Sequence, residues 1–203
     1  MKSLHELGLE HGTDKASVHR YLDFYERWLG KWRNEPVRVL EMGVLGGNSL
    51  RMWDEYFPNP EARIYGLELE AAYWKPGLDS KMGVIVGSQS DHRIADSFVE
   101  QFDVIVDDAG HFGRDQMIAL ELWLPKVKPG GIYIIEDLHA GYWPEYNGNG
   151  AEKIMSFLFG MVHEINCHGN SKVGNRDDCM ADGWRKLVQC MTFRKSVCVI
   201  ERA

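Results

Sequence analysis

Two pairs of neighbouring carboxylates are the residues most able to do chemistry, Asp107-Asp108 and Glu136-Asp137. Each pair ends a short apolar segment of the kind that predicts a buried parallel strand. Because the carboxyl ends of parallel strands meet at one edge of a sheet, we expect these side chains close together. Crowded carboxylates repel unless a cation or proton compensates them, and oxygen ligands suit Mg²⁺. We therefore predict a magnesium site, the alternative being side chains that cap a helix or point into the sheet flank.

A histidine follows each carboxylate pair, His111 three residues after Asp108 and His139 three residues after Glu136. The ordinary pKa of histidine lies near neutrality, so an imidazole here could take a proton from a hydroxyl group. A single histidine is more often structural than catalytic, and it is the adjacent carboxylates that favour a catalytic role. We predict His111 as the general base and keep His139 as a second candidate.

A glycine-rich turn follows the first predicted strand, with glycines at positions 43, 46 and 47. Glycines there allow a tight turn and the close approach of a ligand. The spacing is not the GxGxxG pattern of dinucleotide sites, and an acidic residue two positions before the first glycine suits a ligand with an ammonium or sulfonium group. The alternative is a turn with no ligand. The residues expected to contact a cofactor here are Glu41, Gly43, Gly47 and Ser49.

Polar residues also follow the next two predicted strands. Glu68 lies far enough after the glycines to accept hydrogen bonds from ribose hydroxyls, with Glu70 as the fallback. Ser88, Gln89 and Ser90 follow the third strand and could hydrogen-bond an adenine ring. The alternatives are an exposed strand-end carboxylate for Glu68 and a helix cap for the serine-rich segment.

The elements expected to position these residues alternate between strands and helices. Apolar, β-branched segments predict strands within residues 37–44, 62–70, 82–90, 102–111 and 129–139. Helices are predicted over residues 48–57, 91–101, 114–127 and 151–163. A loop over 168–183 and an antiparallel hairpin of 187–193 with 196–202 follow. The predicted fold class is α/β, a Rossmann-like and mostly parallel sheet with a C-terminal antiparallel hairpin.

Residues 1–32 are predicted to form a helical N-terminal cover, with helices over 3–11 and 17–32. Apolar residues of the second helix fall on one face at helical spacing, and Thr13 or Asp14 would cap it. A chain of 203 residues suits one domain, so we expect residues 1–203 to form a single domain.

The composition is that of an ordinary globular protein, with 44% hydrophobic and 26% charged residues and a net charge of -7. This charge gives no basic field for nucleic acid or anionic membranes. The chain has neither a membrane-spanning apolar segment nor a signal-peptide core, so we expect a cytoplasmic protein with no nucleic-acid or membrane partner. The cysteines form no CxxC pair and are expected to be reduced: Cys167, Cys179, Cys190 and Cys198.

Aromatic residues Tyr142, Trp143 and Tyr146 follow the second carboxylate pair. Aromatic side chains on a loop above a strand end could form a wall for a small acceptor molecule. A packed surface loop is the alternative reading of this segment.

Together these motifs resemble the metal-dependent sugar O-methyltransferases of macrolide biosynthesis, of the mycinamicin and tylosin type, and the related cephalosporin-hydroxylase-like group. The resemblance covers most of residues 8–146 and is carried by HGTDK, LEMGVLGGNSLRMWDEYFPN, IYGLELE, GSQSD, FDVIVDDAGH, PGGIYIIEDLH and GYWPEY. The chain departs from the family pattern at Glu68 and Ser88, where aspartate is commoner, and at Ala109-Gly110, where the family usually has Gly-Ser.

The resemblance implies a class I methyltransferase fold, S-adenosylmethionine as methyl donor and Mg²⁺ held by Asp108, Glu136 and Asp137. It implies that His111 acts as the base toward a sugar hydroxyl and that the GTDK segment and Tyr25 help close the site over the cofactor. We also expect Asp108 to contact the cofactor and the chain to form a homo-oligomer.

The predicted function is thus Mg²⁺-dependent O-methylation of a small hydroxylated acceptor, a natural-product sugar. Two alternatives stay open. One is a nicotinamide-dependent oxidoreductase on a Rossmann fold, against which the missing GxGxxG pattern argues, and the other is a non-catalytic S-adenosylmethionine-binding subunit. The sequence does not identify the acceptor, because a catechol or another vicinal diol would present the same oxygens to a metal.

Overall fold

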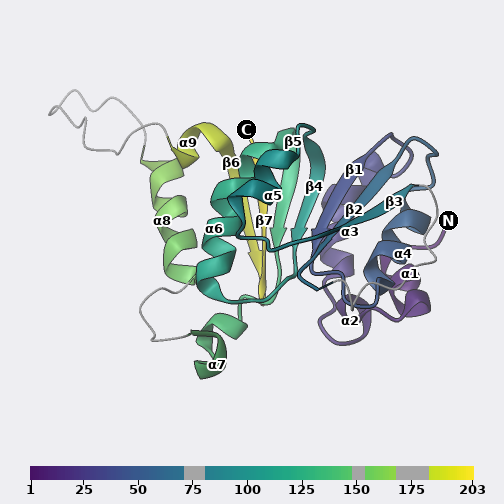
Figure 1. The fold of residues 1–203 in the computed structure, drawn as a ribbon, viewed down its shortest axis with the longest axis horizontal. Coiled ribbons are helices and arrows are strands. Elements are labelled where there is room, and N and C mark those ends of the chain that lie inside the picture. The colour runs from purple at the N-terminus through teal and green to yellow at the C-terminus, as the bar shows by residue number, and fades with distance from the viewer. Residues whose placement is uncertain (71–80, 148–153, 168–182) are drawn as a thin grey trace, which may run out of the picture.

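A seven-stranded sheet forms the centre of the computed structural model, which describes residues 1–70, 81–147, 154–167 and 183–203 (Figure 1). The strands lie in the order β3-β2-β1-β4-β5-β7-β6. Their bounds are β1 Arg38–Met42, β2 Arg63–Glu68, β3 Met82–Val86, β4 Phe102–Asp107, β5 Val127–Ile135, β6 Val188–Arg194 and β7 Val197–Arg202. Each falls within or close to a segment for which the sequence predicts a strand.

Strands β1 to β5 are parallel, and β7 pairs antiparallel with both β5 and β6. The predicted fold class, a mostly parallel Rossmann-like sheet with a C-terminal antiparallel hairpin, is confirmed. The chain builds outward from β1 through β2 to β3, then returns to place β4 on the other side of β1. At such a switch point the crossover helices leave in opposite directions and open a crevice at the strand carboxyl ends.

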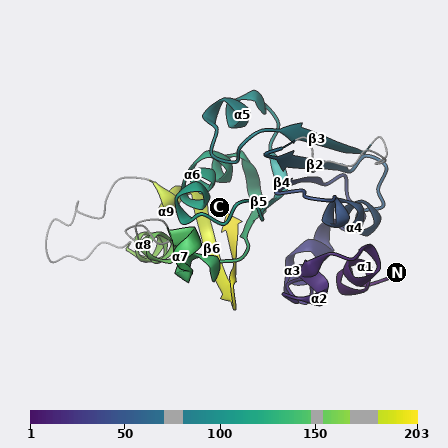
Figure 2. The same cartoon turned by 60° about the horizontal axis from the view of Figure 1, so that its bottom comes forward.

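Helices cover both faces of the sheet (Figure 2). One face carries α1 Leu4–His11, α2 Asp14–Ser17, α3 Leu22–Leu29 with the 3-10 turn η1 Gly30–Trp32, and α4 Asn48–Tyr56. The other carries α5 His92–Ser97, α6 Gly113–Trp123 with η3 Leu124–Lys126, and α8 Ile154–Asn166. Shorter helices follow β5 and precede β6: η4 Ala140–Tyr142, α7 Pro144–Asn147 and α9 Trp184–Leu187.

Side-chain alternation along the strands divides the core into two halves. On β4, Val104 and Val106 face the half that packs on α1 to α4, whereas Ile105 faces the half that packs on α5, α6 and α8. Successive residues of a strand point to opposite faces. The same alternation decides where the polar residues at the strand ends point.

The predicted helix over residues 17–32 is wrong in its first part. The structure has the four-residue α2, then a break, then α3 from Leu22. The β-branched Val18 ends α2, and Arg20 adopts a left-handed backbone with φ 55° that no helix continues. Thr13 does act as a cap, since its side-chain oxygen accepts a hydrogen bond from the Lys15 amide of α2.

The predictions for two further helices, the long loop and the cysteines have different outcomes. The predicted helix over 91–101 ends at Ser97, and residues 151–153 of the predicted helix over 151–163, like most of the predicted loop over 168–183, lie outside the described residues. Cys190 and Cys198 are free thiols, as expected, but Cys167 is disulfide-bonded, so the prediction of a reduced thiol is wrong there. Cys179 lies outside the described residues. Among the helices that the structure describes, none has the length and apolar character needed to cross a bilayer.

Candidate functional site

A cavity of about 660 Å³ opens beside the switch point, at the carboxyl ends of β1 to β4. Its size is typical of a site for a small molecule. Most of the predicted site residues line it, namely Gly43, Ser49, Glu68, Ser88, Gln89, Asp108, His111 and Asp137. The remaining ones do not, namely Glu41, Gly47, Ser90 and Glu136. The N-terminal segment over residues 12–15 forms a further wall.

The glycine turn brings the end of β1 close to the end of β4. Gly43 has φ 91°, and a side-chain Cβ there would lie 2.1 Å from the backbone oxygen of Asp108. A residue with a side chain therefore cannot replace it without moving one of the two strands. Gly47, with φ 76°, precedes the first residue of α4 and turns the chain into that helix.

Glu68 holds the glycine turn in place. One carboxylate oxygen, Oε2, accepts hydrogen bonds from the backbone amides of Val44 (2.9 Å) and Leu45 (2.8 Å). The other oxygen, Oε1, accepts from the Leu69 amide at 2.8 Å. Leu45, which has a φ of 49°, is 69% exposed on the rim of the cavity. Carboxylate oxygens have room for further donors, so Glu68 could both shape the turn and accept hydrogen bonds from a ligand.

Two of the three polar residues after β3 line the cavity, and the third does not. Ser88 and Gln89 line the cavity, and the Nε2 amide of Gln89 is buried without a hydrogen-bond partner among the described residues. An unpaired buried amide is costly, so this group is available to a ligand. The hydroxyl of Ser90 lies 3.0 Å from that of Ser88 and is not in the cavity lining.

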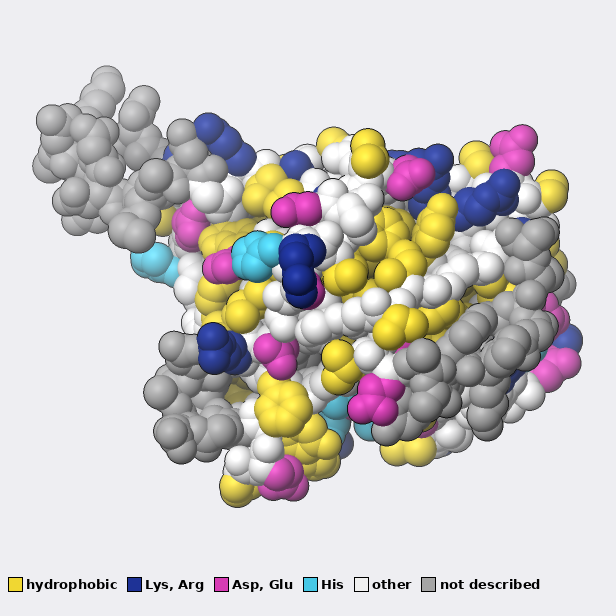
Figure 3. Space-filling view, viewed as in Figure 1, with side chains coloured by type: hydrophobic (Ala, Val, Ile, Leu, Met, Phe, Trp, Pro, Cys, Tyr) yellow, Lys and Arg dark blue, Asp and Glu magenta, His cyan; other side chains and the backbone are white. Residues whose placement is uncertain are grey.

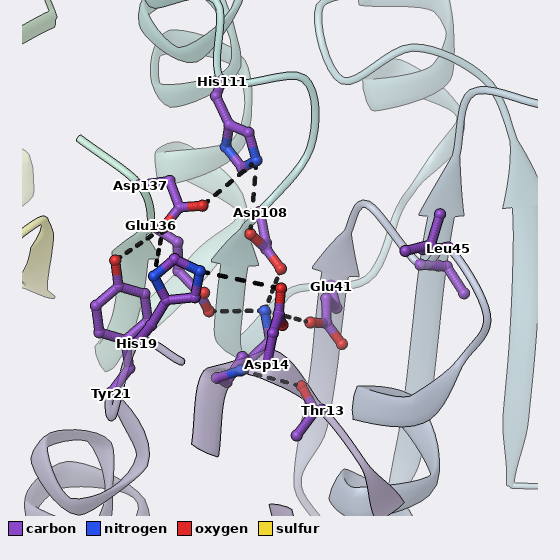
Figure 4. Close-up of polar contacts among 12 residues, drawn as sticks. Thr13, Asp14, His19, Tyr21, Glu41, Leu45, Asp108, His111, Glu136 and Asp137 are labelled. Atoms are coloured by element: carbon purple, nitrogen blue, oxygen red, sulfur yellow. Dashed lines mark hydrogen bonds and ion pairs between the residues drawn. The ribbon is translucent and has the colours of Figure 1, made fainter. Parts of the chain in front are cut away.

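Lys15 lies at the centre of the strand ends and is 1% exposed. Its Nζ is 3.1 Å from Glu41 Oε1 and 3.0 Å from Glu136 Oε1, and it also contacts Asp108 Oδ2 (Figure 4). These carboxylates come from the ends of β1, β5 and β4. The ammonium group of Lys15 therefore compensates a buried concentration of negative charge that would otherwise be very unfavourable.

Strand alternation explains why these particular carboxylates meet. Glu41 lies in β1 and shares a face with Val39, which packs on α1 to α4. Glu136 follows β5 and lies on the same side of the sheet, the face of Ile132 and Ile134. Glu41 is fully buried, and its Oε2 accepts a hydrogen bond from the Trp53 indole at 2.9 Å. The structure thus directs both carboxylates toward Lys15 and not into the cavity, in contrast to the expected ligand contact of Glu41.

Asp107 has the opposite phase and points to the other half of the core. Its Oδ2 accepts a hydrogen bond from the Tyr133 hydroxyl at 3.1 Å, and burial raises the pKa of Asp107 to about 7. Of the two neighbouring aspartates, Asp108 is the one that reaches the cavity.

Asp137 is surrounded by residues from both ends of the chain. Its Oδ1 accepts a hydrogen bond from the Tyr21 hydroxyl at 2.7 Å, and it lies 3.6 Å from His19 Nδ1 and 3.9 Å from His139 Nδ1. Its Oδ2 lies 3.6 Å from His111 Nε2 (Figure 4). Burial and Asp137 raise the pKa of the Tyr21 phenol, so its hydroxyl remains a hydrogen-bond donor.

Asp108, His111 and Asp137 each offer a ligand atom, and these atoms lie within 4.8 Å of one another. Two carboxylates and an imidazole at this spacing fit a divalent cation, with room for waters to complete its shell. Glu136, the third carboxylate implied as a ligand, is not in this group, because it contacts Lys15.

Burial is the main cause of the pKa shifts of Asp108, His111 and the neighbouring Glu136. It raises the pKa of Asp108 and of Glu136, with mutual repulsion adding to the effect and Lys15 opposing it. It lowers the pKa of His111, with Asp137 opposing. At neutral pH the His111 imidazole is therefore neutral, which is the form able to accept a proton or bind a metal.

Comparison with known proteins identifies the domain. A family model described as a methyltransferase domain matches residues 40–138, which include the glycine turn and both carboxylate pairs. Residues 40–138 of this chain are thus similar to a methyltransferase domain. The confirmed Rossmann-like fold is the one expected for such a domain.

Proteins similar to this chain are named as O-methyltransferases of natural products. The chain is 36% identical over 157 residues to the 8-demethyl-8-(2-methoxy-alpha-L-rhamnosyl)-tetracenomycin-C 3'-O-methyltransferase of Streptomyces olivaceus, which spans 71% of this chain and 39% of that protein. It is 35% identical over 157 residues to the mycinamicin VI 2''-O-methyltransferase of Micromonospora griseorubida, spanning 71% of this chain and 38% of that protein.

A solved structure of the MycE methyltransferase from the mycinamycin biosynthetic pathway, in complex with Mg and SAH, matches with a TM-score of 0.84. It is 28% identical, and the match covers 99% of this chain and 54% of that one. The resemblance to macrolide-sugar O-methyltransferases that the motifs predict is therefore confirmed. The chain spans about half the length of MycE and about two fifths of the curated relatives.

The resemblance places the GTDK segment, and with it Lys15, over the cofactor, but sequence reasoning missed two residues beside Asp137, namely His19 and Tyr21. All three lie in the segment that the helical pattern assigns to a cover. The available signal was a polar run, GTDK and, after three intervening residues, His-Arg-Tyr, which interrupts the apolar helical spacing. That run indicates a break in the predicted helix, but it does not indicate which strand end its residues contact.

Aromatic side chains lie beside His111 and His139. Trp143 packs edge-on against His139, with ring centroids 4.7 Å apart, and Tyr146 lies 6.3 Å from His111 and 5.5 Å from Phe112. Tyr142 and Trp143 are partly exposed. In the space-filling view, hydrophobic side chains gather at the lower edge, where Figure 1 places α7 (Figure 3). The rings of Trp143 and Tyr146 thus lie beside His139 and His111, but none of the three aromatic residues is in the cavity lining.

Proposed function

We propose that this chain catalyses Mg²⁺-dependent O-methylation of a sugar hydroxyl on a natural product, with S-adenosylmethionine as methyl donor. The observation that carries the proposal is the group formed by Asp108, His111 and Asp137 on the wall of the cavity that Glu68 and Gln89 also line. Relatives named as sugar O-methyltransferases, and a similar structure holding Mg and SAH, support it.

The proposed cofactor contacts divide into direct and supporting ones. Glu68 would accept hydrogen bonds from the ribose hydroxyls, while Ser88 and Gln89 would bind the adenine ring. Gly43 and Ser49 line the cavity, and Asp108 both lines it and belongs to the metal group. Glu41, Gly47 and Ser90 would act from behind this surface, by holding Lys15, the start of α4 and Ser88.

The proposed metal ligands are Asp108 and Asp137, with Glu136 as the third carboxylate if it gives up its contact with Lys15. Bound Mg²⁺ would hold the acceptor oxygens and lower the pKa of the hydroxyl. His111, outside this set of carboxylate ligands, would take the hydroxyl proton with a ring nitrogen that is not bound to the metal, leaving an oxygen nucleophile for the methyl group. His139 faces the other carboxylate oxygen of Asp137, Oδ1, whereas His111 faces Oδ2. It stays the second candidate base.

The acceptor would lie against the aromatic residues after β5. Trp143 and Tyr146 flank His139 and His111, so an apolar sugar face packed on these rings would present its hydroxyl edge to the base. Names of the similar proteins favour a rhamnosyl or related deoxysugar over a catechol.

The test is a methyl-transfer assay with glycosides that carry a rhamnosyl group with free hydroxyls. We expect S-adenosylhomocysteine and a methylated glycoside to form with Mg²⁺ and to stop forming in a chelator. His111→Ala should lower turnover by on the order of 100-fold or more, because the general base is lost. In the wild type, activity should fall as the pH drops through the lowered pKa of His111.

Several outcomes would contradict the proposal. Turnover that survives chelation would remove the metal from it, and near-wild-type activity of His111→Ala would remove that residue. Cofactor binding without turnover on any glycoside would favour the non-catalytic subunit. The nicotinamide alternative has no support from the matched family, which is a methyltransferase domain.

We also propose a domain organisation, a cellular location and an oligomeric state for the protein. We infer that residues 1–203 act as one methyltransferase domain, that the protein is cytoplasmic with no nucleic-acid or membrane partner, and that it forms a homo-oligomer. Light scattering on the purified chain would test the last of these.

A further inference from the structure

The N-terminal segment holds one oxygen of each carboxylate in the candidate metal group. Tyr21 donates its hydroxyl hydrogen to Asp137 Oδ1 at 2.7 Å, and the Lys15 ammonium contacts Asp108 Oδ2. The remaining oxygens both face His111 Nε2, with Asp137 Oδ2 at 3.6 Å and Asp108 Oδ1 at 4.0 Å. Each aspartate thus has one oxygen bound to the protein and one directed at the centre of the group (Figure 4).

A carboxylate held by one oxygen cannot rotate freely, so the direction of the other oxygen is fixed. Donors of this kind, one step behind the ligands, are known to control how tightly a metal binds. Tyr21 is itself well fixed, being 2% exposed with its ring stacked on those of His19 (5.1 Å) and Tyr25 (6.0 Å). Its hydroxyl position is therefore set by packing before any ion binds.

The backbone of Asp137 gives a reason for such a restraint. Its φ of 53° lies in the left-handed region, which costs energy for a residue with a side chain. Such a conformation persists where the surroundings hold it. The neighbouring Leu138 amide is held by the Ser196 carbonyl at 2.9 Å, and the Tyr21 hydroxyl restrains the Asp137 side chain.

We propose that Tyr21 is a positioning residue of the metal site, which holds Asp137 by one oxygen so that the other faces the ion. This inference rests on the proposed function, because it takes Asp108 and Asp137 to bind a divalent cation. The competing explanation is structural, in which the Tyr21 hydroxyl serves to dock the N-terminal segment on the sheet.

The test compares Tyr21→Phe with Tyr56→Phe in the full chain. Tyr21→Phe keeps the stacked ring and removes the hydroxyl alone. Tyr56, on α4, is an equally buried tyrosine that lies outside the metal group and packs against Arg33. Mn²⁺ is the probe, titrated with detection of the free ion by electron paramagnetic resonance. We expect Tyr21→Phe to bind Mn²⁺ about 10–100-fold more weakly than the wild type and Tyr56→Phe to bind it normally.

Two further readouts separate the explanations. S-adenosylhomocysteine affinity in a chelator should be the same in all three proteins, since the hydroxyl acts on the metal side. If Tyr21→Phe is less stable, its melting temperature should still rise less on adding Mn²⁺ than that of Tyr56→Phe, because the rise reports ion binding to the folded form.

The inference is overturned if Tyr21→Phe binds Mn²⁺ like the wild type. It is also overturned if Mn²⁺ affinity, S-adenosylhomocysteine affinity and stability fall together, which would indicate the docking role. A wild type that binds no Mn²⁺ would remove the metal from the proposed function and this inference with it, whereas normal wild-type binding confines any failure to Tyr21.

Discussion

Lys15 is the residue on which the charge balance of the site depends. It contacts the carboxylates of Glu41, Asp108 and Glu136 at the ends of three strands, and it is almost completely buried. Removing one partner of a buried ion pair leaves the others uncompensated, which costs far more than losing an exposed pair.

We therefore expect Lys15→Met to lower the free energy of unfolding by about 3–5 kcal/mol. The matched control is Lys128→Met, which removes a lysine that pairs with Asp103 while 36% exposed and should cost less than about 1 kcal/mol. Urea unfolding at neutral pH measures both. Equal effects of the two substitutions would show that the buried carboxylates do not need this cation.

Asp107 gives the stability a dependence on pH that one substitution can isolate. Burial raises its pKa to about 7 in the folded chain, above the value near 4 of an unfolded aspartate. Between these values the folded state binds more protons than the unfolded state, so this group's contribution falls as the pH rises and is fully unfavourable above about pH 7.

Asp107→Asn carries no charge and keeps an oxygen to accept the Tyr133 hydroxyl. We expect it to be more stable than the wild type by a few kcal/mol at about pH 8, with the difference shrinking toward about pH 4. Denaturant unfolding across this range measures the difference. A difference independent of pH would mean that Asp107 is ionised throughout.

At the residue scale, the sequence predicts which carboxylates lie at the strand ends but not which of them reach the cavity. Period-two alternation could have separated Asp107 from Asp108, and could have turned Glu41 away from the cavity, since both follow from the phase of the apolar strand positions. Lys15 and Tyr21 could not be found in this way. Their partners lie roughly a hundred residues away in sequence, and no local pattern encodes such a contact.

The N-terminal elements carry these distant residues to the sheet. Helix α1 packs tightly on the segment that follows it, with Gly8 at the contact. A side-chain Cβ at Gly8 would lie 2.8 Å from the Cβ of Ala16 and 2.3 Å from Leu22 Cδ1. The Ala16 atom cannot move without moving α2 and therefore Lys15.

We expect Gly8→Ala to destabilise the protein by about 1–3 kcal/mol through overpacking, although alanine favours helices. Gly160→Ala is the control, because Gly160 lies in α8 with open space around its Cα. That substitution should stabilise by about 0.5–1 kcal/mol. Thermal unfolding of both variants measures the contrast, and a stabilising Gly8→Ala would mean that α1 is not closely packed there.

At the element scale, the parallel strands were predicted well because buried strands are short, apolar and bounded by glycines and acids. The helix over residues 17–32 was not, because helical spacing in Leu22, Tyr25 and Leu29 extends no farther back than α3. What breaks the pattern is the left-handed Arg20 and the turn of His19 and Tyr21 toward Asp137. Tertiary contacts with the sheet thus override a plausible local helix.

At the scale of the whole molecule, the residues that we propose bind the cofactor and the metal lie at one edge of the sheet. The strand order reverses between β1 and β4, and the cavity opens there, with the glycine turn and Glu68 to one side and the metal group to the other. The N-terminal segment closes this edge with Lys15 and Tyr21. We propose that the cavity binds the S-adenosyl cofactor.

The measurement that tests this claim most directly is a calorimetric titration of the full chain with S-adenosylhomocysteine in the presence of Mg²⁺. We predict binding in the micromolar range, at least about 10-fold weaker in Glu68→Ala, because the variant loses the carboxylate that holds the glycine turn and that we propose binds the ribose. Glu121→Ala, an exposed glutamate on α6, should bind like the wild type. Failure of the well-folded wild type to bind S-adenosylhomocysteine, or unchanged binding in Glu68→Ala, would contradict the account.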